Sequence, residues 1–249
     1  RHSSWTLLGR VCFHLPENKN SEETPFAFLA TYAHQISEDG KTRHLPLSRA
    51  LEEYAKQKNV LLRLLAPIHK ASRESLFIGE YVESGDIYHP LAWTAGETYR
   101  FLKDIPIFEK SGIIVRVPNW WKPRQPSRLQ VAIRIGDKKN GGIGFEALLD
   151  FSMSVMLGDE ELNREEIQDL LDRSDNLIFF KGQWVEVDKD RLSDILSKWK
   201  SVAKSVKNDG VPFAEGLRLL AGVDGTISNV AETQSLTRVI PGKWLQGVL

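Results

Sequence analysis

The stretch Arg128-Leu129-Gln130-Val131-Ala132-Ile133-Arg134-Ile135 places Leu129, Val131, Ile133 and Ile135 on one side and Gln130, Ala132 and Arg134 on the other. Because successive side chains of a β-strand point to opposite faces, this alternation predicts a strand with one buried face. Residues 150–157 alternate in the same way, with Phe151, Met153, Val155 and Leu157 as the apolar set. These two stretches predict a mostly antiparallel sheet with one face in water.

Helices and a hairpin are predicted around this sheet. Residues 162–171 form a helical pattern, and 177–180 and 184–187 flank Lys181-Gly182-Gln183 as a hairpin would. Asp188 is a predicted N-cap for a helix with one apolar stripe, formed by Leu192, Ile195, Leu196, Trp199, Val202, Ala203 and Val206. Residues 213–220 predict a last helix, and the Gly-, Ser- and Thr-rich residues after it predict a connector.

The residues before Gly112 have a different, mainly helical pattern. After two predicted strands, 5–14 and 26–36, Ser48 is expected to cap a helix. A helix over 60–71 should end or kink at Pro67, another over 74–83 should close at Ser84-Gly85, and a short one follows over 107–110. Thr94 and Glu97 have capping-box spacing and predict a helix start.

Together these patterns predict an α+β protein with a helical first half and a mostly antiparallel sheet with flanking helices in the second half. We expect three regions: a mainly helical region with N-terminal strands over 1–111, an α+β region over 112–222, and a connector over 223–249. Arg1 stands at the first position, and the methionines are Met153 and Met156. We therefore expect a piece of a longer protein.

Composition excludes several classes of function. The 33 basic and 33 acidic side chains cancel, which argues against a uniformly basic nucleic-acid coat. Cys12 is the single cysteine, so we expect neither an internal disulfide nor a cysteine-based zinc site, and the six histidines lack metal-ligand spacing. We expect no metal site. No stretch approaches the ~20 apolar residues of a membrane span, and we expect a cytoplasmic protein with no membrane partner.

Motifs for catalysis are missing as well. The phosphate-binding loop of nucleotide motors is absent, because the glycine-rich residues 140–144 lack the Lys-Ser/Thr pair. No Gly-x-Ser-x-Gly elbow occurs, and we assign no catalytic residue. The alternative is a metal-dependent nuclease-like domain built on Asp137-Lys138-Lys139, which follows an apolar strand. That chemistry needs a second carboxylate on the same metal, for which Asp150 is a candidate.

The strongest local signal is electrostatic. Between residues 113 and 139 the single acidic residue is Asp137, and Trp120-Trp121 lies in the middle. The basic residues of this stretch are Arg116, Lys122, Arg124, Arg128, Arg134, Lys138 and Lys139. Basic side chains neutralise phosphates and aromatic rings stack on unpaired bases. The DNA-binding hypothesis therefore names Arg116, Trp120, Trp121, Lys122, Arg124 and Arg128. The alternative is a solvated hairpin whose tryptophans pack in the core or against a neighbouring domain. Residues 141–172 are acidic, so the zero net charge conceals a dipolar arrangement.

A resemblance to known proteins rests on several stretches and on their order along the chain: residues 26–32 (FAFLATY), 44–54 (HLPLSRALEEY), 87–94 (IYHPLAWT), 114–121 (IVRVPNWW), 148–151 (LLDF) and 184–188 (WVEVD). Together they resemble the region upstream of the ATPase core in bacterial Swi/Snf-type helicase-like proteins. The resemblance spans residues 5 to 222, most of the chain, and its motifs are not catalytic signatures.

This resemblance implies a DNA-dependent, ATP-driven translocase as the parent protein, with two ATPase lobes after Leu249. ATP and Mg²⁺ would serve the parent, with no cofactor in this fragment. The chain itself would be a non-catalytic accessory domain that docks on the ATPase core of the same polypeptide, or guides DNA or a partner to it. No functional residue is transferred from the family to this region.

Overall fold

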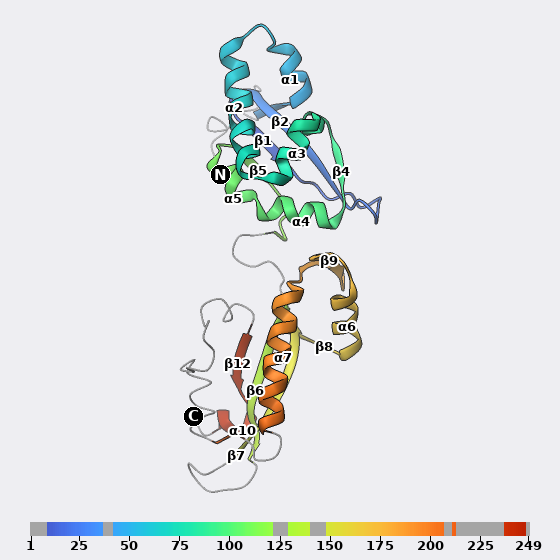
Figure 1. The fold of residues 1–249 in the computed structure, drawn as a ribbon, viewed down its shortest axis with the longest axis vertical. Coiled ribbons are helices and arrows are strands. Elements are labelled where there is room, and N and C mark those ends of the chain that lie inside the picture. Colours follow the sequence, from blue (N-terminus) through green and yellow to red (C-terminus); the bar gives the residue numbers. More distant parts are fainter. Residues whose placement is uncertain are drawn as a thin grey trace. The chain divides into compact units, whose positions relative to one another are not determined.

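The computed structural model describes residues 9–36, 42–121, 129–139, 148–206, 211–212 and 237–247. Its contacts divide the chain into two units, Arg1–Lys122 and Pro123–Leu249 (Figure 1). The observed elements are of the predicted α+β class. Among the described residues, no helix is long and apolar enough to cross a membrane.

The first unit is built on a five-stranded sheet. Its strands are β1 (Val11–His14), β2 (Phe26–Ile36), β3 (Thr42–Pro46), β4 (Leu91–Trp93) and β5 (Ile114–Arg116). The path runs β3-β2-β1-β5, and β4 pairs with the start of β2, where Phe26 lies opposite Trp93. β5 is parallel to β1, and the other pairs are antiparallel.

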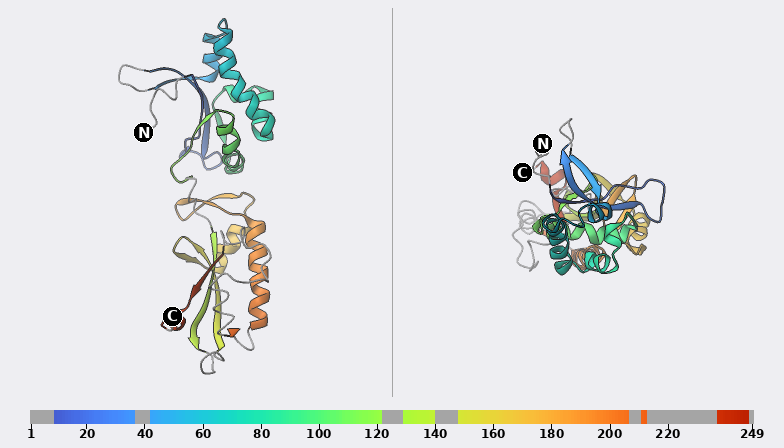
Figure 2. Two further views of the ribbon diagram at one scale, coloured as in Figure 1. Left: turned by 90° about the vertical axis from the view of Figure 1, so that its left-hand side faces the viewer. Right: turned by 90° about the horizontal axis from the view of Figure 1, so that it is seen from above.

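The helices of the first unit lie on one side of its strands (Figure 2). They are α1 (Leu47–Glu53), α2 (Lys58–Glu74), α3 (Leu76–Ser84), the short 3₁₀ helix η2 (Asp86–Tyr88), α4 (Ala95–Lys103) and α5 (Ile105–Lys110). The capping box predicted at Thr94 and Glu97 is confirmed at the start of α4. Gly85 ends α3 with a left-handed backbone, φ 84°, a conformation open to glycine.

An aromatic core joins this sheet to its helices. Phe28 stacks on Trp93 with ring centroids 4.4 Å apart, and Phe13 contacts both Phe28 and Phe108 edge to face. Phe101 contacts all four of these rings. Buried aromatic side chains contribute large apolar areas and specific ring geometry, so this cluster fixes the helical side of the sheet.

The second unit contains a second five-stranded sheet and a separate hairpin. The sheet strands are β6 (Leu129–Lys139), β7 (Leu148–Leu157), β8 (Glu160–Leu162), β11 (Val211–Pro212) and β12 (Thr237–Pro241). Its path is β11-β7-β6-β12, and β8 pairs with β7. The β6–β7 pair is antiparallel, as the two alternating stretches predicted, whereas β12 is parallel to β6.

The helices in the described part of this unit are α6 (Arg164–Asp172), α7 (Lys189–Val206) and the short α10 (Lys243–Gln246). α7 runs along β6 and β7 (Figure 1). One core contains the predicted apolar sides of β6 and α7, among them Val131, Ile133, Ile135, Leu192 and Ile195. Asp188 accepts a hydrogen bond from the backbone N–H of Arg191, 3.1 Å away, as an N-cap does.

The predicted hairpin is confirmed as β9 (Leu177–Phe180) and β10 (Gln183–Glu186). Its two-residue turn has positive φ at both positions, 47° at Lys181 and 80° at Gly182. That combination matches the twist of paired strands and is the usual geometry of short hairpins.

Some predictions on helix and strand ends are wrong. Ser48 lies inside α1, whose N-cap position is Pro46, because β3 pairs with β2 as far as Pro46. Pro67 lies within α2 and does not end it, since Leu64, Ile68 and Ala71 keep one buried side along the helix. The predicted helix over 213–220 falls outside the described residues.

The regions drawn from the sequence differ from the structural units. The first unit extends to Lys122, past the expected boundary at residue 111, because β5 pairs with β1. Within the expected connector, residues 237–241 form β12 on the sheet of the second unit. Both differences come from pairing between segments far apart in the sequence.

Candidate functional site

Three residues of the DNA-binding hypothesis lie in the described part of the first unit. Arg116 is exposed at the end of β5, and Trp120 and Trp121 follow it with partial exposure. The backbone N–H of Trp121 donates to the carbonyl of Pro118 at 3.1 Å, which closes a turn around the pair. Lys122, Arg124 and Arg128 fall outside the described residues, so their positions remain predictions.

Trp120 is held against the first unit. Its indole Nε1 donates to Oε1 of Glu17 at 2.5 Å, and its ring lies 5.8 Å from that of Phe26. Trp121 contacts Trp120 edge to face, with centroids 6.1 Å apart. The structure therefore anchors one tryptophan on the unit and leaves the second beside it with part of its surface in solvent.

The acidic segment of the second unit makes local ion pairs. Lys181 in the hairpin turn contacts carboxylates of Glu160 and Glu166, the latter at 2.7 Å. Asp169 pairs with Arg173 at 2.9 Å. Part of the negative charge counted in the sequence is therefore offset inside the second unit, which reduces the dipolar character inferred from the sequence.

Asp137, the residue of the nuclease alternative, is engaged in structural contacts. Its Oδ1 accepts a hydrogen bond from the backbone N–H of Lys243 at 3.0 Å, at the start of α10. Its Oδ2 lies 3.9 Å from Nε of Arg134. Among the described residues, Asp137 belongs to no group of three or more side chains with metal-ligand spacing. These contacts give it a role in holding α10 to β6.

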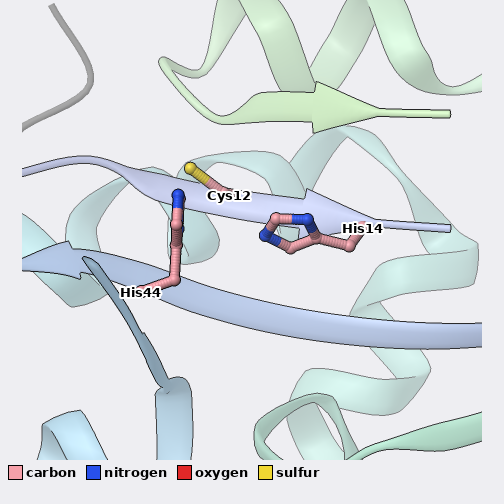
Figure 3. A group of neighbouring side chains, drawn as sticks. All are labelled: Cys12, His14 and His44. Carbon is pink, nitrogen blue, oxygen red and sulfur yellow. The ribbon is translucent and has the colours of Figure 1, made fainter. Parts of the chain in front are cut away.

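A cluster that sequence spacing did not connect lies on the first unit's sheet. Cys12 and His14 project from β1 and His44 from β3, and one ligand atom of each lies within 4.8 Å of the others (Figure 3). Cys12 lies opposite Thr31, and His44 lies opposite Ala33, two positions further along β2. Residues two apart in a strand share a face, so the register brings these side chains together.

A threonine hydroxyl joins the two imidazole rings. Oγ1 of Thr31 lies 2.8 Å from Nε2 of His14 and 3.1 Å from Nδ1 of His44. The rings are edge to face, with centroids 5.3 Å apart. Nε2 of His44 is buried and has no hydrogen-bond partner among the described residues. Buried polar atoms are rarely left without a partner, so this nitrogen calls for an explanation.

The surroundings keep both histidines neutral at pH 7. Burial, followed by the charges of His44 and Arg116, lowers the pKa of His14 from 6.5 to about 4. Burial and the nearby charges of Arg116 and His34 lower the pKa of His44 as well. Burial raises the pKa of the Cys12 thiol, although Arg116 opposes this rise. Arg116, which lies opposite His14 on β5, thus acts on the whole cluster.

Comparison with known proteins identifies the family. The family described as SNF2 Helicase protein matches residues 86–221, more than half of the chain. YwqA of Bacillus subtilis, provisionally named an ATP-dependent helicase/translocase, is 23% identical over 106 residues, which are 42% of this chain and 11% of that protein. The chain thus spans only a small part of the length of this curated relative. No solved structure matches. The resemblance inferred from the sequence motifs is confirmed, and the chain belongs to the family of SNF2 helicase proteins.

Proposed function

We propose that this chain is a non-catalytic accessory region of a cytoplasmic, ATP-driven DNA translocase, and that it guides DNA to the ATPase core of the same polypeptide. ATP and Mg²⁺ would act in that core. Membership of the SNF2 helicase family supports the nature of the parent. The observation that supports the guiding role is the anchored tryptophan pair beside the exposed Arg116.

The anchoring of Trp120 favours a binding role for Trp121. A side chain that is already held in place loses less conformational entropy when it binds a ligand. Glu17 and Phe26 fix Trp120, and Trp120 in turn supports the ring of Trp121. Stacking of one base on an aromatic side chain contributes about 1–3 kcal/mol, which corresponds to roughly 5- to 150-fold in affinity.

Charge supports the same surface. Arg116 is exposed on β5, and the sequence continues past Trp121 with Lys122, Arg124 and Arg128. In this proposal the basic side chains contact phosphates and set the position of the strand, while Trp121 stacks on a base or wedges between two bases. Phosphate contacts carry no sequence information, so we expect binding that depends on salt and little on base sequence.

The test is titration of labelled single-stranded and duplex DNA with the chain across a salt series. Trp121→Ala should weaken binding of single-stranded DNA about tenfold, and Arg116→Ala should reduce the salt slope by about 1. Matched controls are Phe179→Ala, an exposed aromatic of the second unit, and Arg63→Ala, an exposed arginine of α2. Neither control should change affinity by more than about twofold, because neither lies on the proposed surface.

Three outcomes would count against DNA guiding. Salt-independent binding, or equal losses in the Trp121→Ala and Phe179→Ala variants, would reject this surface as the DNA site. If the chain binds no DNA but binds the separately produced ATPase core, and Trp121→Ala weakens that complex, the role is docking on the motor. Exposed apolar side chains typically mark such docking surfaces.

A further inference from the structure

The Cys12, His14 and His44 cluster offers the donor set of a transition-metal site. One sulfur and two imidazole nitrogens converge on one face of the sheet, with the ligand atoms within 4.8 Å of one another (Figure 3). Zn²⁺ binds cysteine and histidine in proteins, whereas Ca²⁺ and Mg²⁺ take oxygen ligands. The donors therefore select a borderline or soft ion.

The nitrogen of His44 without a partner is suited to ligation. Its Nε2 is buried and has no hydrogen-bond partner among the described residues, while its Nδ1 faces the hydroxyl of Thr31. Metal-bound histidines usually donate their other ring N–H to an oxygen, which fixes the ring. In the tautomer that carries its proton on Nδ1, His44 donates to the hydroxyl of Thr31 in that manner. The hydroxyl also contacts Nε2 of His14, so the same residue positions both rings.

An ion at this position would change the protonation of the third ligand. The thiol of Cys12 would release its proton on binding, because the charge of a bound ion overrides the effect of burial. His14 and His44 are partly exposed, which leaves a path for an ion to enter, whereas Cys12 is fully buried.

We propose that Cys12, His14 and His44 bind one Zn²⁺ ion, which joins β1 to β3 across β2 and keeps a water as fourth ligand. Zn–S near 2.3 Å and Zn–N near 2.0–2.1 Å in a tetrahedron place the donor atoms about 3.3–3.6 Å apart. The donors now lie within 4.8 Å, so small rotations of the two partly exposed histidines are enough to close the site.

The experiment strips the chain with a chelator and titrates it with Zn²⁺ against a chromophoric competitor. Wild type should bind one Zn²⁺ per chain, and Co²⁺ in its place should give thiolate-to-metal charge-transfer absorption. His44→Gln should weaken binding at least about 100-fold, because loss of an outer-shell partner alone costs 10- to 100-fold. His69→Gln, an exposed histidine on α2, is the control and should bind like wild type.

Other results of this titration would reject the proposed zinc site. Substoichiometric Zn²⁺, equal affinity of His44→Gln and wild type, or a Co²⁺ complex without thiolate absorption would reject it. Cys12 is buried, so Cys12→Ser can unfold the sheet; His44→Gln therefore decides the matter, with circular dichroism as the check on folding. Zn²⁺ should raise the melting temperature of wild type and leave that of His44→Gln unchanged, since an ion stabilises only the state that binds it.

Discussion

Replacing Gly242 by alanine should strongly destabilise the second unit. A Cβ at this position would lie 2.2 Å from the backbone nitrogen of Asp137 and 2.5 Å from the carbonyl carbon of Gly136. Both are backbone atoms of β6, so no side-chain rotation relieves the overlap. The φ of Gly242 is −72°, which alanine adopts readily, and the cost therefore comes from contact rather than from backbone conformation.

The size of this loss in stability can be worked out from the steric overlap and from the hydrogen bonds that a displacement of the chain would break. Forcing one extra carbon into a closely packed site costs about 1–3 kcal/mol. Moving the chain away would also break two hydrogen bonds, from Gly242 N–H to the carbonyl of Ile135 (2.7 Å) and from Lys243 N–H to Asp137 (3.0 Å). Each such bond contributes about 1 kcal/mol. The sum is about 3–5 kcal/mol, more than 100-fold in the unfolding equilibrium.

Urea unfolding, with hydrogen exchange of β6 and β12 to assign the transition, measures this loss. Gly247→Ala is the matched control, because its Cβ would come no closer than 3.4 Å to the carbonyl oxygen of Trp244. We expect the control to change stability by less than about 1 kcal/mol, as surface substitutions usually do. A Gly242→Ala variant as stable as the control would refute the close approach of this segment to β6.

Two further predictions concern the first unit. Thr94→Ala should lower the stability of this unit by about 1 kcal/mol through loss of the capping box on α4. Ser72→Ala, which removes a hydroxyl that donates to the carbonyl of His69 within α2, is the control and should not lower it. Equal urea midpoints for the two variants would contradict this. In metal-free buffer, the contribution of His14 to the stability of the first unit should be complete above pH 6.5 and should be lost as the pH falls toward 4. In this pH range the unfolded chain binds a proton at His14, whereas the folded chain does not, because its ring has a pKa of about 4. His14→Gln should flatten the change in urea midpoint between pH 7 and pH 5, and an unchanged slope would exclude His14 as the cause.

Local patterns allowed much of the fold to be predicted. The β9–β10 hairpin depends on its own two turn residues, and the start of α4 depends on Thr94 and Glu97 three residues later. The alternating stretches of β6 and β7 set which sides face the core, because a strand's faces follow from its period of two. Each of these features is determined by residues that are close in sequence.

Elements that depend on distant partners were missed. β4 is only three residues long and is defined by pairing with Phe26–Phe28 of β2, and β12 is defined by pairing with β6. The Cys12, His14 and His44 cluster is of the same kind, because only the sheet register brings β1 and β3 residues together. By contrast, Arg116, Trp120 and Trp121 could be named from the sequence, since clustered charge and aromatic residues are visible without a fold.

The β6–β12 pair also sets when the second unit can finish folding on the ribosome. β6 ends at Lys139 and its parallel partner begins at Thr237, so roughly a hundred residues are translated between them, which takes about 5–20 s at about 5–20 residues per second. Throughout that interval one edge of β6 offers its N–H and C=O groups to any other strand. A chain cut to the family-matched residues 86–221 would keep this edge open permanently, and we expect such a fragment to self-associate through it.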